Sequence, residues 1–182
     1  MVRGQGRGGT APGTLEEFPL EKWGDLPLER YTLGPDAGAL PGRSFCRLME
    51  YGTDTFGSIR GGSAAKHIIF QHRGGGWRIV PASLRDIEPR EAWNRVRGEF
   101  VTAFSAAKEQ AYGRIDELES LSYGQALTTK ALAVYFPDEF LPVFSFSRLR
   151  DADKKYAALE WPTAGWCPQS ALSWAATQSA TP

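Results

Sequence analysis

A helical pattern of large apolar residues, beginning at Pro89, sets the strongest limit on the fold. Proline is favoured at the first position of a helix. From there, apolar side chains recur at steps of three or four residues, at Trp93, Val96, Phe100, Phe104 and Ala107. The spacing predicts one long amphipathic helix that runs to about residue 110. Its apolar stripe must be covered by a sheet or by other helices.

The flanking segments predict the rest of an α+β domain. Residues 43–51 alternate in the manner of a strand, and residues 66–71 and 77–80 predict two short strands joined by a glycine-rich tip as a hairpin. A second helix is expected from Tyr123 to Phe136, ending before Pro137. We therefore expect a small, mainly antiparallel sheet at about residues 43–80 covered by three helices, at about 89–110, 123–136 and 146–159.

Composition predicts one domain with two tails. Residues 1–14 are rich in glycine and suggest a disordered leader, residues 15–160 form the α+β domain, and residues 161–182 are a charge-free tail rich in Trp, Ala and Ser. The two cysteines, Cys46 and Cys167, are typical of reduced thiols rather than of a disulfide framework. No run of residues is apolar and long enough to span a membrane, so we expect a soluble, cytoplasmic protein.

The charges are balanced overall but unevenly distributed. The chain has 21 basic and 21 acidic residues, yet residues 43–97 carry ten Lys or Arg against five Asp or Glu. A glycine-rich stretch, Gly52–His67, lies within this basic segment. Gly57 and Gly62 have the glycine spacing of a phosphate-binding loop, but Ser63 stands where that motif requires lysine, so a nucleoside triphosphatase is not predicted. The stretch instead predicts a loop that offers amides and positive charge to an anion.

For a nucleic-acid backbone as the anion, this loop and the hairpin supply suitable residues. The candidate nucleic-acid-binding residues are Arg60, Gly61, Gly62, Ser63, Lys66, His67, Arg73 and Arg78. The aromatic candidates for a base pocket are Tyr51, Phe56 and Trp77. A purely structural interpretation stays open, in which the glycines only permit tight turns and the aromatic rings are core residues.

Two segments carry a resemblance to a known family. One is Leu48–Asp54 together with Gly57–Lys66, and the other is Ala133–Ser145. Together they resemble the N-terminal region that precedes the AAA+ motor in some McrB-like, modification-dependent restriction proteins. The resemblance covers about residues 20–150 and implies recognition of modified DNA, with a motor or a nuclease subunit as partner. The chain contains no Walker A motif and no motor, so GTP hydrolysis is not implied for it.

Two other functions remain as alternatives. One is a protein-interaction domain that docks an AAA+ motor or a nuclease. The other is a Mg²⁺-dependent nuclease, because Pro137-Asp138 followed by Asp153-Lys154-Lys155 superficially matches a restriction-nuclease pattern, although both segments are predicted as helix or helix connection. The sequence suggests no catalytic residue, no cofactor and no metal site. DNA binding in a restriction or defence system is thus the expected function.

Overall fold

The computed structural model describes residues 16–33, 44–72 and 74–141 of the chain. The elements in chain order are the 3-10 helix η1 (Leu20–Asp25), α2 (Leu28–Tyr31), α3 (Phe45–Tyr51), the 3-10 helices η3 (Asp54–Phe56) and η4 (Ala64–His67), β1 (Ile69–Gln71), β2 (Trp77–Ile79), the 3-10 helix η5 (Ala82–Leu84), α4 (Pro89–Lys108), α5 (Gly113–Asp116), α6 (Glu119–Ser122) and α7 (Gln125–Tyr135). The expected α+β fold is confirmed.

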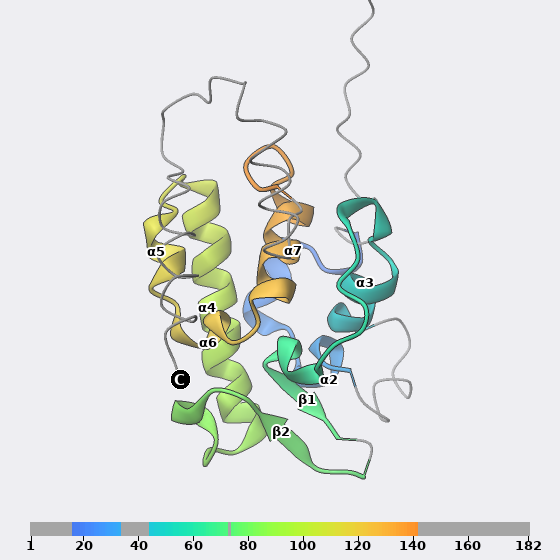
Figure 1. The fold of residues 1–182 in the computed structure, drawn as a ribbon. Helices are drawn as coiled ribbons and strands as arrows, with labels where there is room; N and C mark the ends of the chain where they lie inside the picture. The colour runs from blue at the N-terminus through green and yellow to red at the C-terminus, as the bar shows by residue number, and fades with distance from the viewer. Residues whose placement is uncertain (1–15, 34–43, 73, 142–182) are drawn as a thin grey trace, which may run out of the picture.

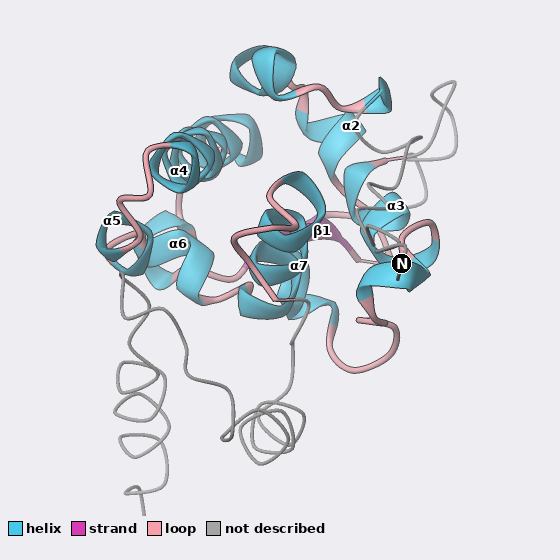
Figure 2. Cartoon of the chain, turned by 90° about the horizontal axis from the view of Figure 1, so that it is seen from above, coloured by secondary structure: helices cyan, strands magenta, loops and turns pink. Residues whose placement is uncertain are grey.

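The helices surround a central α7, with the hairpin at one end (Figure 1). The long helix α4 lies on one side of α7, and α5 and α6 pack against α4. The short helices α2 and α3 lie on the other side of α7, as the view from above also shows (Figure 2). The hairpin of β1 and β2 lies near the N-terminal end of α4. None of the helices in this described part combines the length and the apolar character needed to cross a membrane.

The core is an aromatic cluster centred on Trp23 in η1. The Trp23 ring lies 4.8 Å from the ring of Phe45 in α3 and 4.9 Å from that of Phe104 in α4. Its indole N–H donates to the Tyr135 hydroxyl at 3.0 Å, so α7 joins the same cluster. Trp93 in α4 is also buried, and its indole N–H donates to the carbonyl of Leu26 at 2.7 Å. The predicted stripe of α4 therefore forms the core as expected.

The strand predicted at residues 43–51 is wrong, because Phe45–Tyr51 form helix α3, while Arg43 lies outside the described residues. The alternation was misleading, since apolar residues also occupy the intervening positions, so both sets of alternate residues are largely buried. Ser44 caps the helix, and its Oγ accepts a hydrogen bond from the Arg47 amide at 3.4 Å. Only Arg47 and Tyr51 of α3 are exposed, which fits a helix with one solvent-facing side. The sheet consequently has two strands in the described residues.

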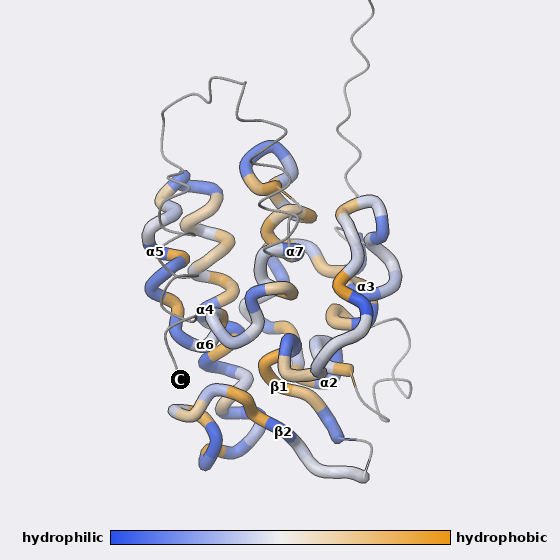
Figure 3. Tube along the Cα trace, in the orientation of Figure 1, coloured by the Kyte–Doolittle hydropathy of each residue, from blue (hydrophilic) through white to orange (hydrophobic). Residues whose placement is uncertain are grey.

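The predicted hairpin is confirmed but is shorter than expected. β1 and β2 pair antiparallel, with Phe70 opposite Arg78. Residues 66–68 do not belong to β1, because η4 runs to His67 and Ile68 has a φ of 66°. A β-branched residue rarely adopts positive φ, and here it turns the chain sharply into the strand. β1 is coloured mostly as apolar, whereas the glycine-rich hairpin tip is pale, near the middle of the hydropathy scale (Figure 3).

The second predicted helix is confirmed as α7, one or two residues shorter at each end. The third predicted helix at residues 146–159 lies outside the described residues, as do the predicted leader at 1–14 and the tail at 161–182.

Candidate functional site

The glycine-rich stretch forms an exposed turn between η3 and η4. Gly61 and Gly62 have φ values of 79° and 69°, a conformation that side chains disfavour. Within the described part of the chain, the backbone amides of Gly61, Gly62 and Ser63 donate no hydrogen bond. These three residues are exposed, so their amides are accessible to a ligand. Successive free amides of this kind are suited to an anion.

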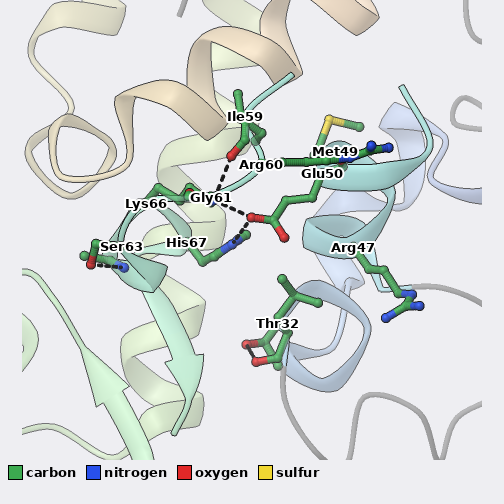
Figure 4. Close-up of polar contacts among 12 residues, drawn as sticks. Thr32, Arg47, Met49, Glu50, Ile59, Arg60, Gly61, Ser63, Lys66 and His67 are labelled. Carbon is green, nitrogen blue, oxygen red and sulfur yellow. Dashed lines mark hydrogen bonds and ion pairs between the residues drawn. The ribbon is translucent and has the colours of Figure 1, made fainter. Parts of the chain in front are cut away.

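Lys66 stabilises the conformation of this turn from its interior side (Figure 4). Its ammonium group donates to the carbonyls of Ile59 and Gly61, both at 2.7 Å, and forms an ion pair with the carboxylate of Glu50. The side chains of Lys66 and Glu50 are only 14% and 7% exposed. Because the turn carbonyls point at the Lys66 ammonium, Lys66 positions the turn, and its own charge is compensated by Glu50.

His67 is also an interior residue. Its ring is buried, and Nε2 lies 3.2 Å from Oε1 of Glu50. Burial lowers the pKa of His67 below 6.5, although the neighbouring Glu50 opposes this shift. His67 is therefore neutral near pH 7, and its Nδ1 has no hydrogen-bond partner within the described residues. The structure thus brings Lys66 and His67 together around Glu50 rather than at the surface.

Two residues that the sequence pattern did not indicate support the same turn: Lys130 in α7 and Gly124, the N-cap of α7. The buried Lys130 donates from Nζ to the carbonyl of Gly57 at 2.6 Å, and burial lowers its pKa to about 8. At Gly124, a Cβ would lie 2.4 Å from Cγ1 of Ile68 and 2.8 Å from the carbonyl oxygen of Lys66, so only glycine fits. The sequence did contain one indication of Lys130, because a single lysine within the apolar run of α7 is unusual unless it has a partner.

The exposed candidates gather around Tyr51. The Tyr51 side chain is 54% exposed, and the guanidinium carbons of Arg47 and Arg60 lie 5.7 Å and 5.1 Å from its ring centroid. We call Arg47, Tyr51 and Arg60 the Arg–Tyr–Arg patch. Arg60 also forms an ion pair with Asp54 at 2.8 Å, and its Nε donates to the carbonyl of Glu50 at 3.1 Å. Arg47 has no ion pair within the described residues, so it supplies the uncompensated charge of the patch.

The other aromatic candidates are not part of this patch. Phe56 is buried and belongs to the core. Trp77 is half-buried and, with the exposed Arg78, lines a separate recess of about 340 Å³ on the hairpin. Arg73 lies outside the described residues. The structure therefore divides the predicted residues between the turn, the core and the hairpin instead of forming one base pocket.

The residues of the nuclease alternative are only partly described. Asp138 is exposed in the turn after α7, whereas Asp153, Lys154 and Lys155 lie outside the described residues. In the part of the chain that is described, no three His, Cys, Asp or Glu residues come together as a metal site.

Comparisons with models of protein families, with curated proteins and with solved structures found no match to this chain.

Proposed function

We propose that the chain binds DNA through the Arg–Tyr–Arg patch and the adjacent turn at Gly61–Ser63, as the specificity module of a restriction or defence system. The observation that carries this proposal is the exposed Tyr51 ring with the guanidinium groups of Arg47 and Arg60 over it. This arrangement is suited to a nucleotide if a guanidinium group leaves the ring to pair with a phosphate, because the uncovered ring face can then stack on a base.

The charges around the patch favour an anion. Arg47 is exposed and has no carboxylate partner in the described part of the chain. Arg60 is paired with Asp54, but both side chains are about half exposed, at 45% and 59%. Such a surface ion pair contributes only about 0–1 kcal/mol, so a phosphate can replace Asp54 at little cost. The free amides of the turn provide further donors for a phosphate oxygen.

The buried residues have a positioning role in this proposal. Lys66 fixes the carbonyls of Ile59 and Gly61 toward the interior, which leaves the amides of the turn outside. Lys66 and His67 therefore act through the shape of the turn and do not touch DNA. The recognition of modified bases is the part of the proposal that rests on sequence alone, on the expected resemblance of Leu48–Asp54, Gly57–Lys66 and Ala133–Ser145 to McrB-like restriction proteins.

Fluorescence anisotropy with a labelled duplex tests DNA binding. Arg47→Gln removes an exposed charge without breaking an ion pair. If Arg47 contacts one phosphate, the slope of log K against log salt should become shallower by about 0.9. Tyr51→Ala should weaken binding by about 1–3 kcal/mol if the ring stacks on a base, whereas Tyr51→Phe should retain most of the affinity.

Lys108→Gln is the matched control, because Lys108 is an exposed cation at the C-terminal end of α4, outside the Arg–Tyr–Arg patch. If Arg47→Gln and Tyr51→Ala bind like the wild type with an unchanged salt slope, the patch is not the DNA site. Titration of unmodified and base-modified duplexes of the same sequence tests the specificity. The proposal expects tighter binding to a modified duplex. Equal affinities for the two duplexes would show that the chain does not recognise the base modification.

A further inference from the structure

The outer edge of β2 carries unpaired backbone groups. The Val80 amide donates to the carbonyl of Ile68 at 2.9 Å, and the His72 amide donates to that of Gly76 at 3.0 Å. These bonds identify which residues of the hairpin bond across to the other strand and which face outward. Because hydrogen-bonded and non-hydrogen-bonded pairs alternate in an antiparallel ladder, the N–H and C=O groups of Trp77 and Ile79 point away from β1. None of these four groups has a hydrogen-bond partner among residues 16–33, 44–72 and 74–141. The edge of β2 is therefore open over two outward-facing residues.

The opposite edge of the hairpin is covered by the chain itself. The Gln71 amide donates to the carbonyl of Leu33 at 3.2 Å, and the Thr32 hydroxyl donates to the carbonyl of Ile69 at 3.2 Å. The segment after α2 thus pairs with two outward groups of β1, the Gln71 amide and the Ile69 carbonyl. Open edges tend to pair with other chains, and proteins usually cover or blunt them. Since residues of the described part pair with the outer edge of β1 and none of them pairs with that of β2, the edge of β2 is a candidate for pairing with another chain.

A recess with positive charge lies along this open edge. Its volume is about 340 Å³, and it is lined by Trp77, Arg78, Ile79, Arg85, Ile87 and Pro89. Arg78 and Arg85 are exposed, and their guanidinium groups form no ion pair or hydrogen bond within the described residues. Most other arginines of that part are paired, for example Arg90 with Glu29 and Arg95 with Glu91. The edge thus combines free backbone groups, an apolar lining and two uncompensated cations.

We propose that the open edge of β2 binds an extended acidic peptide of a partner protein as a third strand. The peptide backbone pairs with the outward groups of Trp77 and Ile79, its apolar side chains enter the recess, and its carboxylates pair with Arg78 and Arg85. Strand addition obtains affinity from backbone hydrogen bonds and specificity from pockets for alternate side chains. This edge is separate from the Arg–Tyr–Arg patch, and the inference does not depend on DNA binding.

The backbone pattern favours a peptide over a nucleic acid. The edge of β2 presents two carbonyl oxygens as well as two amides. A peptide strand supplies both donors and acceptors to match them. Phosphate groups supply acceptors only, so they leave the outward carbonyls of Trp77 and Ile79 unpaired. The charges of Arg78 and Arg85 then select an acidic peptide.

NMR of the ¹⁵N-labelled full chain, titrated with a short synthetic peptide of alternating glutamate and valine, tests the proposal. The amide signals of Trp77 and Ile79 should shift most, and their exchange with water should slow. A peptide with lysine in place of glutamate should bind more weakly. The double variant Arg78→Glu/Arg85→Glu should lose about tenfold or more in affinity for the glutamate peptide, because each contact then becomes repulsive. Lys108→Glu at the far end of α4 should leave it unchanged.

A second form of the peptide keeps the test decisive if the double variant does not fold. N-methylation of alternate peptide residues removes the donors facing β2 and should abolish binding. Equal binding of the methylated and unmethylated peptides would overturn strand addition. The proposal would also be overturned if millimolar glutamate peptide caused no shift at Trp77 and Ile79, or if a DNA duplex shifted the same two amides and displaced the peptide.

Discussion

Replacement of Lys66 by methionine tests whether the interior ion pair holds the turn. The Lys66 ammonium pairs with the carboxylate of Glu50 and donates to the carbonyls of Ile59 and Gly61. Lys66→Met keeps an apolar stem but leaves a carboxylate that is 7% exposed without its main counter-charge. Loss of one partner of a buried pair costs about 3–5 kcal/mol. Because Lys66 is itself 14% exposed, we expect the lower end, about 3 kcal/mol, in the free energy of unfolding.

The pH dependence distinguishes this explanation from simple loss of packing. In the wild type, the pKa of His67 is depressed by burial, so stability is lost as the pH falls from 6.5 toward the folded-state pKa. Glu50 raises the pKa of His67, whereas Lys66 lowers it. In Lys66→Met the lysine charge that lowers the pKa of His67 is gone, so His67 is protonated more readily. Protonated His67 can then replace Lys66 as the counter-ion of Glu50. The destabilisation should therefore be smaller at about pH 5.5 than at about pH 8.

Urea unfolding followed by tryptophan fluorescence measures both effects, because Trp23 and Trp93 are buried. Lys108→Met makes the same substitution at an exposed lysine of α4 and should change the free energy of unfolding by no more than about 0.5 kcal/mol. A loss in Lys66→Met below about 1 kcal/mol would show that solvent, and not Lys66, compensates Glu50. A large loss that does not depend on pH would refute the role of His67.

Three further substitutions test the supports of the turn and of α3, each by urea unfolding. Gly124→Ala should destabilise the protein by about 1–3 kcal/mol, since a Cβ overlaps Ile68 and the Lys66 carbonyl, and an unchanged midpoint would contradict this packing. In the wild type, the free energy of unfolding should rise between about pH 8 and pH 10, because in this range Lys130 is neutral in the folded protein and still protonated in the unfolded chain. Lys130→Met should lack that rise. Ser44→Ala should cost about 1 kcal/mol by removing the cap of α3, and no loss would argue against the cap.

Periodicity was sufficient where one face of an element is apolar and the other polar. α4 meets this condition, so its stripe from Trp93 onward and its start at Pro89 could be predicted. α3 does not, because Phe45, Cys46, Leu48 and Met49 are all buried and seven residues are too few to separate a period of 2 from one of 3.6. The cap at Ser44 was the signal that would have favoured a helix.

For the site, the sequence identified the residue types but not their partners. Arg60, Lys66 and the glycines do form one turn, as the stretch predicted. Their carboxylate partner could not be identified, because Glu50 was assigned to a strand and its position in α3 directs it into the interior. Lys130 lies 73 residues from its acceptor in the turn, and contacts at such separation depend on tertiary packing that periodicity does not report.

One buried carboxylate determines which cations of this region are available to a ligand. Glu50 needs a counter-charge, which Lys66 provides, and Lys130 is buried against the Gly57 carbonyl. Arg60 is paired with Asp54 at the surface and can exchange that carboxylate for a phosphate, so within the described residues Arg47, Arg60 and the turn amides are the groups available to an anion. Because the interior contacts fix the turn without a ligand, binding does not have to order it, and that entropy cost is avoided. Affinity at the Arg–Tyr–Arg patch should consequently depend on Glu50 and Lys66, although neither side chain needs to touch the ligand.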